Sequence, residues 1–203
     1  MSNKYFITGI GTGIGKTITS AVITEKLKAD YWKPIQSGDL EQSDSLAIQS
    51  LISNHQTVIH PETYRLTQPL SPHLSAKLDG IALELDKIVL PATENTLIVE
   101  GAGGLMVPLS DKHLIVDLIK HLELEVILVS QNYLGSINHT LLSINLLKQY
   151  QIPLKGLIFN GTANPESETY ILNYSQLPCL GHIPLMQHPD KTAIAKAGEG
   201  LTL

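Results

Sequence analysis

Short β-like runs alternate along the chain with helical stretches, and several of the runs are continuously apolar. Continuous apolar runs are typical of strands that helices cover on both faces. The pattern predicts strands over Lys4–Thr8, Tyr31–Lys33, Thr96–Glu100, Glu125–Ser130, Leu154–Asn160 and Cys179–Ile183. It predicts helices over Lys16–Ala29, Ser43–Ser53, Leu85–Pro91, Ile115–Leu122, Ile137–Tyr150 and Pro165–Tyr174.

This alternation predicts an α/β fold with a doubly wound, mainly parallel sheet flanked by helices. The 203 residues are enough for one domain with a two-sided core, and no linker or composition shift divides them. We therefore expect residues 1–203 to form a single domain. Ligands of such sheets collect at the carboxyl ends of the strands, so the residues that follow each strand are the first candidates for chemistry.

Composition narrows the range of partners. Lysine and arginine total 14 against 19 acidic residues, and no segment combines basic residues with stacking aromatics, so nucleic acid is not an expected partner. No apolar run approaches the roughly 18 residues of a membrane helix, and the first strand follows no cleavable leader, so we expect a cytoplasmic protein. Cys179 is the single cysteine, which excludes an internal disulfide and a cysteine-based zinc cluster. We interpret it as a small apolar residue of a late strand.

A glycine-rich run follows the first strand and reads Gly9-Ile10-Gly11-Thr12-Gly13-Ile14-Gly15-Lys16-Thr17. In such a loop the backbone N–H groups turn toward phosphate oxygens, Lys16 can reach the β- and γ-phosphates, and the Thr17 hydroxyl can hold Mg²⁺. The usual pattern is G-x-x-x-x-G-K-[ST], whereas here Ile10 replaces its first glycine and Gly9 lies one residue further out. Because a strand precedes the loop and a helix follows it, the run predicts a variant phosphate loop of the P-loop NTPase fold.

The second predicted strand leads into Lys33-Pro34-Ile35-Gln36-Ser37-Gly38. Lys33 could supply a cation for a transferring phosphoryl group, and Ser37 a neutral hydrogen bond. Taken alone, the segment is more typical of a solvated lysine beside a turn. Further on, Ser43 is placed to cap a helix, and Asp44 is either a partner of the helix dipole or a magnesium ligand.

A carboxylate follows the buried strand that ends in Val99. Glu100 precedes Gly101-Ala102-Gly103-Gly104, whose glycines allow the backbone to approach a phosphate or a substrate closely. A buried lone carboxylate costs several kcal/mol, so we expect a metal or a hydrogen-bond network to compensate it. Next to a phosphate loop, this is the position for a second acidic magnesium ligand.

Together these segments resemble the dethiobiotin synthetase family, whose members are ATP-dependent carboxylases of biotin synthesis. The resemblance spans nearly the whole chain in order, and the lysine-proline-x-x-serine-glycine loop and the later asparagine-histidine segment are its most specific parts. The matching stretches are Tyr5 to Thr17, Lys33 to Gly38, Ser43-Asp44, Leu70-Ser71-Pro72-His73, Val99 to Gly104, Leu134-Gly135-Ser136-Ile137-Asn138-His139, Gly156 to Asn160, and Leu180 to Pro184.

The resemblance implies a reaction without a protein nucleophile. One amine of 7,8-diaminononanoate captures CO₂ as a carbamate, the carbamate takes the γ-phosphoryl group of ATP to give a carbamic-phosphoric anhydride, and the second amine displaces phosphate to close the ring. Lys33 corresponds to the family's catalytic lysine and acts together with Lys16. The implied cofactor is Mg²⁺, held by Thr17, Asp44 and Glu100, and ATP is a co-substrate.

The resemblance also assigns the binding residues. The nucleotide site comprises Gly13, Ile14, Gly15, Lys16, Thr17, Ile18, Asp44, Glu100, Gly101, Ala102, Gly103, Asn160, Gly161, Pro184, Leu185 and Met186, with Asn160 contacting adenine. The substrate site comprises Thr12, Ser37, Gly135, Ser136 and Asn138. The last three open a helix whose free N–H groups suit the substrate's distant carboxylate, and in this family that helix comes from the partner subunit of a homodimer. Gly13 stands where many members carry an acidic residue.

Two other classes share this fold. Partitioning and septum-positioning ATPases are switches that dimerise on ATP, but they carry an extra lysine at the start of the loop, where this chain has Gly11. Amidotransferase-type synthetases carry a glutaminase domain, and no nucleophile motif surrounds Cys179 here. The sequence therefore favours a synthetase, whose ATP turnover requires its small-molecule substrate, and not a switch ATPase.

Overall fold

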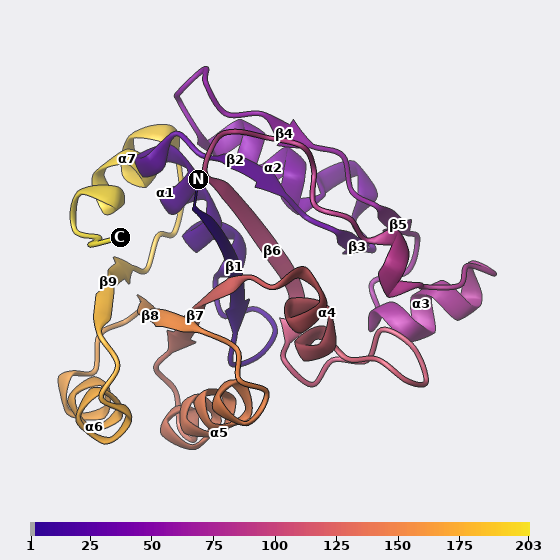
Figure 1. The fold of residues 1–203 in the computed structure, drawn as a ribbon. Coiled ribbons are helices and arrows are strands. Elements are labelled where there is room, and N and C mark those ends of the chain that lie inside the picture. The colour runs from indigo at the N-terminus through magenta and orange to yellow at the C-terminus, as the bar shows by residue number, and fades with distance from the viewer. Residues whose placement is uncertain (1–2) are drawn as a thin grey trace.

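The structure of this chain is a computed structural model that describes residues 3–203, so the first two residues of the expected domain lie outside it. Within that range the main sheet has seven strands in the order β4-β2-β6-β1-β7-β8-β9, and every paired neighbour runs parallel (Figure 1). The predicted parallel, doubly wound sheet is confirmed. Its strands are β1 (Lys4–Gly9), β2 (Asp30–Trp32), β4 (Ile59–His60), β6 (Leu97–Gly104), β7 (Glu125–Gln131), β8 (Leu154–Gly161) and β9 (Cys179–Pro184).

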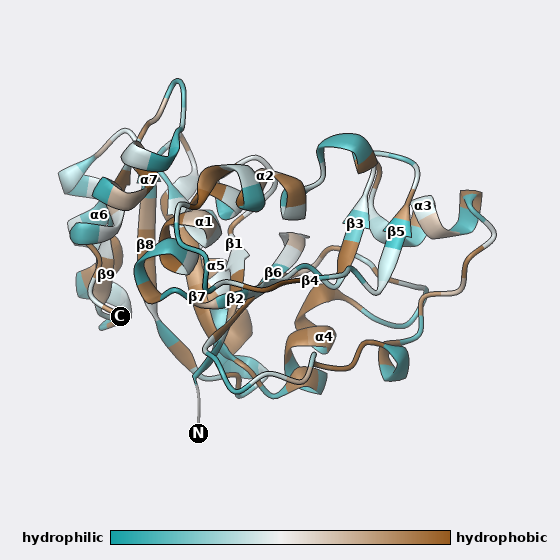
Figure 2. Ribbon diagram, turned by 90° about the horizontal axis from the view of Figure 1, so that it is seen from above, coloured by the Kyte–Doolittle hydropathy of each residue, from teal (hydrophilic) through white to brown (hydrophobic). Residues whose placement is uncertain are grey.

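Helices cover both faces of this sheet. The helices α1 (Lys16–Leu27), α2 (Asp44–Leu51) and α7 (Lys191–Glu199) lie on one face, and α4 (Ile115–Leu122), α5 (Ser136–Gln149) and α6 (Pro165–Ser175) lie on the other (Figure 1). Figure 2 shows brown apolar stretches along strands such as β2, β7 and β8, while polar teal stretches lie on outer helices and loops. None of the helices within residues 3–203 is long and apolar enough to cross a membrane.

Alternation along the buried strands divides the core into two clusters. Tyr31 and Ile98 belong to the cluster beneath α1, whereas Trp32 and Val99, one residue later in each strand, belong to the cluster on the opposite face. This follows from the pleat of a strand, which sends successive side chains to opposite faces. The continuous apolar runs of the sequence are therefore explained by burial on both sides.

Short elements account for most differences from the predicted pattern. The expected helix over Leu85–Pro91 is wrong: only Leu85–Lys87 forms a single 3₁₀ turn, and the chain then runs extended. Ile88 is buried while Val89 is 68% exposed, so the apolar residues here do not share one helical face.

Cys179 is the first residue of β9, as expected, but its side chain is exposed and not packed in the core. The elements that the pattern missed are β3 (Ile35–Ser37), β5 (Tyr64–Leu66), a 3₁₀ turn over Leu40–Gln42, β4, α3 (Pro72–Leu78) and α7.

The strand order determines where the chemistry gathers. β1 lies between β6 and β7, and β2 pairs with the other edge of β6. The carboxyl ends of β2, β6 and β1 are therefore neighbours, although β6 follows both other strands by more than sixty residues in the chain. Ile7 pairs with Glu100 across β1 and β6, so the glycine-rich loop after β1 begins beside the carboxylate of β6.

Candidate functional site: a phosphate loop over a buried ionic cluster

The glycine-rich loop joins β1 to α1 and depends on two close approaches. Gly15 precedes α1 with φ of 89°, and a Cβ there would lie 2.1 Å from Nδ2 of Asn160. A Cβ at Gly9 would lie 2.2 Å from Cδ1 of the buried Ile14. The amide of Asn160 donates to the carbonyl of Ile14 at 3.0 Å, which ties the end of β8 to the loop. The glycines thus let the loop close tightly around its own side chains.

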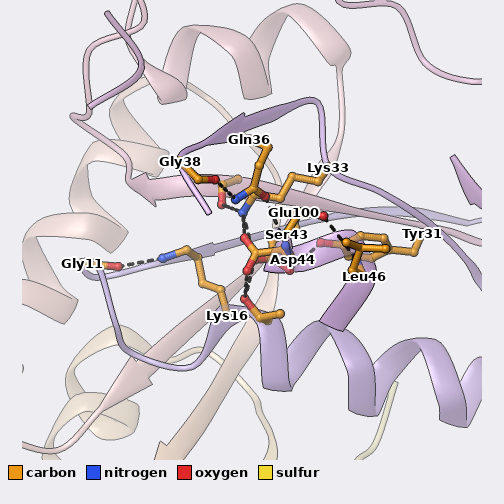
Figure 3. A network of polar contacts seen from close by, with 12 residues as sticks. Gly11, Lys16, Tyr31, Lys33, Gln36, Gly38, Ser43, Asp44, Leu46 and Glu100 are labelled. Carbon is orange, nitrogen blue, oxygen red and sulfur yellow. Dashed lines mark hydrogen bonds and ion pairs between the residues drawn. The ribbon is translucent and has the colours of Figure 1, made fainter. Parts of the chain in front are cut away.

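Two lysines lie close to the loop: Lys16 is the first residue of α1, and Lys33 directly follows β2. Lys16 is buried, and its Nζ donates to the carbonyl oxygen of Gly11 at 2.9 Å across the loop. Lys33 is only 4% exposed and forms ion pairs with Asp44 and, at 3.2 Å, with Oε1 of Glu100 (Figure 3). The interpretation of Lys33 as a solvated lysine is therefore wrong, because β2 carries it beneath the surface next to the carboxylate of β6.

Glu100, at 1% exposure, is compensated by a hydrogen-bond network, as its position after a buried strand predicted. Thr17 Oγ1 lies 3.0 Å from Oε1 of Glu100 and 2.9 Å from Oδ1 of Asp44, so it bridges the two carboxylates. Ser43 caps α2 by accepting the N–H of Leu46 at 3.4 Å. The cap and the acidic site therefore use neighbouring residues, with Ser43 holding the helix and Asp44 facing Lys33.

Two residues of this network were not identified from the sequence. The Tyr31 hydroxyl donates to Oε2 of Glu100 at 2.9 Å (Figure 3). Gln36 accepts the backbone N–H of Asp44 at 3.2 Å and donates to the carbonyl of Gly38 at 3.0 Å, so it holds the start of α2 against the loop after β3. The only sequence signal for either residue was its position within one or two residues of Lys33 or Ser37.

The electrostatics of the cluster keep it charged. Burial alone would neutralise Lys33, but the carboxylates of Glu100 and Asp44 outweigh burial and raise the pKa of Lys33 above its ordinary value. Burial likewise opposes the charge of Asp44, and the ion pair with Lys33 outweighs it and lowers the pKa of Asp44. Burial and then the charge of Glu100 raise the pKa of Tyr31 well above its ordinary value, so its phenol keeps the proton that it donates.

Lys16 differs from Lys33 in this respect. Burial lowers the pKa of Lys16 to about 8, and the nearby Glu100 offsets only part of that effect. The cation of Lys16 is therefore mostly present at neutral pH, and an added negative group such as a phosphate would stabilise it.

A cleft of about 820 Å³ opens above the cluster. Ser37 lines it, and in the part of the chain that the structure describes its buried hydroxyl oxygen has no hydrogen-bond partner. The cleft brings together most of the predicted phosphate and substrate residues, which are Thr12, Gly13, Gly15, Lys16, Thr17, Ile18, Lys33, Ser37, Asp44, Glu100, Ala102 and Gly103.

The oxygen atoms beneath the cleft suit a hard cation. The Thr17 hydroxyl lies within hydrogen-bonding distance of carboxylate oxygens of both Asp44 and Glu100. Three oxygen atoms that could bind a metal ion therefore converge from α1, α2 and β6. Mg²⁺ prefers oxygen ligands and is usually held by one or two carboxylates together with phosphate oxygens. The residues present therefore fit Mg²⁺.

The remaining predicted residues do not line this cleft. Asn160, Gly161, Pro184, Leu185 and Met186 lie at or just beyond the ends of β8 and β9, outside this cleft, although Asn160 contacts the glycine-rich loop. Gly101 follows Glu100 in β6, and its carbonyl accepts from Lys33 at 3.5 Å. Gly135, Ser136 and Asn138 line a separate cleft of about 760 Å³ between α5 and α6. One chain alone therefore does not bring the start of α5 to Lys33.

Solved structures that share this fold include ATPases of the MinD and ParA families. The septum site-determining protein MinD of Pyrococcus horikoshii, complexed with Mg-ADP, superposes with a TM-score of 0.63 at 15% identity, covering 98% of this chain and 95% of the other. A ParA family ATPase of Chlorobium tepidum gives 0.58 at 15% identity, covering 99% and 100%. The family described as AAA domain matches residues 3–192. Fold and cleft thus define a P-loop nucleotide-binding protein.

Sequence relatives specify the family within this class. ATP-dependent dethiobiotin synthetase BioD of Christiangramia forsetii is 49% identical over 199 residues, covering 98% of this chain and 96% of the relative. The protein of the same name from Cytophaga hutchinsonii is 51% identical over 181 residues, covering 89% and 87%. The chain belongs to the dethiobiotin synthetase family, which confirms the resemblance seen in its motifs. The likeness to partitioning ATPases is one of fold.

Proposed function

We propose that this chain is an ATP- and Mg²⁺-dependent ligase, a dethiobiotin synthase of the cytoplasm. It carboxylates 7,8-diaminononanoate with CO₂ and closes the ureido ring of dethiobiotin, and ATP becomes ADP and phosphate. Besides family membership, the observation that carries the proposal is the buried Lys33 held between Asp44 and Glu100 beneath a cleft that also contains the phosphate loop.

The chemistry needs positioning and charge rather than a nucleophile from the protein. A carbamate forms from CO₂ and one amine of the substrate, and its oxygen attacks the γ-phosphorus of ATP with release of ADP. The second amine then attacks the carbonyl carbon of the mixed anhydride, and phosphate leaves. Lys33 and Lys16 supply two cations next to the oxygens that gain charge in these steps. The ion pairs of Lys33 keep it protonated and fixed in place.

Thr17, Asp44 and Glu100 would hold Mg²⁺, which neutralises phosphate charge when it is bound. Ser37 would donate to or accept from the reacting end of the substrate, which would satisfy its unpaired hydroxyl. Asn160 would contact the adenine ring together with Gly161 and Pro184 to Met186 near the ends of β8 and β9.

A homodimer would complete the substrate site. Gly135, Ser136 and Asn138 lie at the start of a helix of 14 residues, and the N–H groups and positive dipole end of a helix start suit a carboxylate. Because these residues line a cleft other than the one above Lys33, the partner's copy would have to hold the carboxylate that lies several methylenes away from the amines.

A subunit-mixing experiment tests this sharing. A mixed dimer of Lys33→Gln and Asn138→Asp chains would contain one site with both defects and one with neither. Recovery of near-wild-type KM in a fraction of the sites supports the shared site. Simple addition of the two parental activities, once subunit exchange has been confirmed, contradicts it.

Substrate dependence of ATP turnover tests the activity itself. A synthetase should release phosphate only when the diamine and CO₂ are both present, because the phosphoryl acceptor is formed from them. A switch ATPase would instead hydrolyse ATP slowly without either. Phosphate release that is independent of the diamine would argue against the proposed function.

A further inference from the structure

Strand register brings a second β2 side chain to the carboxylate of β6. Tyr31 pairs with Ile98 and Trp32 with Val99, which places Glu100 two residues beyond the partner of Tyr31. Side chains two residues apart on a strand share a face, so Tyr31 and Lys33 both point to the side of Glu100. Glu100 is thus a diagonal neighbour of Tyr31 across this parallel pair, and a tyrosine side chain is long enough to span such a diagonal. The 2.9 Å hydrogen bond from the Tyr31 hydroxyl to Oε2 shows that it is reached.

The two oxygens of Glu100 have different partners. Oε1 lies 3.0 Å from the hydroxyl of Thr17 and 3.2 Å from Nζ of Lys33, so it faces two residues that line the cleft. Oε2 turns away toward β2, where, among the described residues, Tyr31 gives its one hydrogen bond. The carboxylate is thus held at one end by a fully buried phenol, with the other end turned to the proposed metal site.

We propose that Tyr31 is a positioning residue, which fixes the rotation of the Glu100 carboxylate so that Oε1 stays available as a magnesium ligand. The inference rests on the proposed function, because it takes Glu100 as a metal ligand. Groups that hydrogen-bond to a metal-binding carboxylate set its orientation, and their loss commonly costs about 10- to 100-fold in metal affinity or activity. Without the phenol, Oε2 lacks a donor, and the carboxylate is free to rotate away from Thr17.

The alternative is that Tyr31 only fills the core. It lies in the apolar cluster beneath α1 with Tyr5, which is also buried and whose hydroxyl makes none of the contacts of the Glu100 network. Tyr5→Phe is therefore the matched control, because it removes a hydroxyl from the same cluster and leaves Glu100 untouched. A packing role predicts similar effects of the two substitutions, whereas a positioning role predicts an effect on metal dependence from Tyr31→Phe alone.

The test measures ATP binding by calorimetry against Mg²⁺ concentration, without the diamine, so that no turnover is needed. We expect Tyr31→Phe to raise the Mg²⁺ concentration for half-maximal ATP binding by about tenfold or more and to leave the ATP affinity without metal unchanged. Tyr5→Phe should change neither quantity. In the Glu100→Gln background, Tyr31→Phe should add nothing, because the two residues act through one carboxylate. An unchanged midpoint in Tyr31→Phe, or a further shift in the double variant, overturns the inference.

Failure of the proposed function gives a different pattern. If Glu100→Gln alone leaves the magnesium dependence unchanged, then Glu100 is not a ligand and the metal assignment itself fails. If Glu100→Gln shifts the midpoint and Tyr31→Phe does not, only the positioning role fails. Should Tyr31→Phe not fold, the double variant decides: a folded protein with the midpoint of Glu100→Gln supports the inference, and a double variant that also fails to fold contradicts it.

Discussion

Replacing Lys33 with glutamine removes the cation from between two carboxylates. Lys33 is almost fully buried, and its ammonium group pairs with both Asp44 and Glu100. Glutamine keeps most of the side-chain length, and its amide NH₂ can still donate hydrogen bonds, so the change is mainly one of charge. The variant should lose both reaction rate and stability, for separate physical reasons.

The rate loss comes from the charge that develops on the transferring phosphoryl group and on the carbamate. Loss of one preorganised transition-state contact commonly costs about 3 kcal/mol, which is about a hundredfold in kcat or more. Because the diamine and ATP are bound by other groups as well, KM should change much less than kcat. Steady-state phosphate release with saturating substrates measures this split.

The stability loss comes from Glu100, which stays buried without its cation. Breaking a fully buried ion pair costs about 3–5 kcal/mol. The cost here should lie toward the lower end, because Thr17 and Tyr31 still donate to Glu100 and the Asp44 side chain is 30% exposed. Urea unfolding followed by the fluorescence of Trp32, the single tryptophan, measures it. Mg²⁺ with ATP should restore more stability to the variant than it adds to the wild type, because a cation then returns to the two carboxylates.

Lys26→Gln is the matched control for Lys33→Gln. Lys26 is an exposed residue of α1, and among residues 3–203 its Nζ donates to one group, the carbonyl of Gly198, at 2.8 Å. We expect this control to change stability by less than about 1 kcal/mol and to leave kcat unchanged. Wild-type turnover in a folded Lys33→Gln protein would refute the role given to Lys33.

Three further predictions follow from the site and its surroundings. Asn138→Asp should raise the KM for the diamine by repelling its carboxylate and leave ATP affinity nearly unchanged; an equal loss of ATP affinity would speak against the assignment. ATP affinity should fall as pH rises through about 8, because Lys16 loses its proton there, and titrations of Lys16→Gln should lack this decline. Burial opposes the charge of Glu25, but hydrogen bonds from Ser53 and Asn54 outweigh it and lower its pKa to about 2. That stabilisation is present above about pH 4.5 and lost as pH falls toward 2, so unfolding of Glu25→Gln should show less stability at pH 7 and a shallower acid decline.

The sequence predicted the parts of the fold whose signal is local. Strands buried on both faces are continuous apolar runs, and each was found within a few residues of its observed bounds. Elements of two or three residues, such as β3 and β4, carry too few positions to show a period. The false helix at Leu85–Pro91 arose because apolar spacing alone does not reveal which residues face the core, and Val89 does not.

The site was predictable where one residue type at one position implies one chemistry. Gly15, Lys16 and Thr17 form such a set, and the network around Glu100 was expected because a buried carboxylate requires compensation. Tyr31 was missed because a tyrosine within an apolar strand is normally a core residue, and its partner lies 69 positions away in the chain. Pairing between distant strands is a property of register, which no local pattern contains.

Isotope labelling tests the central claim most directly. Purified protein is incubated with ATP, Mg²⁺, 7,8-diaminononanoate and ¹³C-bicarbonate as the source of CO₂, and the product is examined by mass spectrometry and carbon NMR. The account predicts dethiobiotin with the label in its ureido carbonyl and one phosphate released per ring closed. Phosphate release without labelled dethiobiotin, or with the diamine omitted, would contradict it.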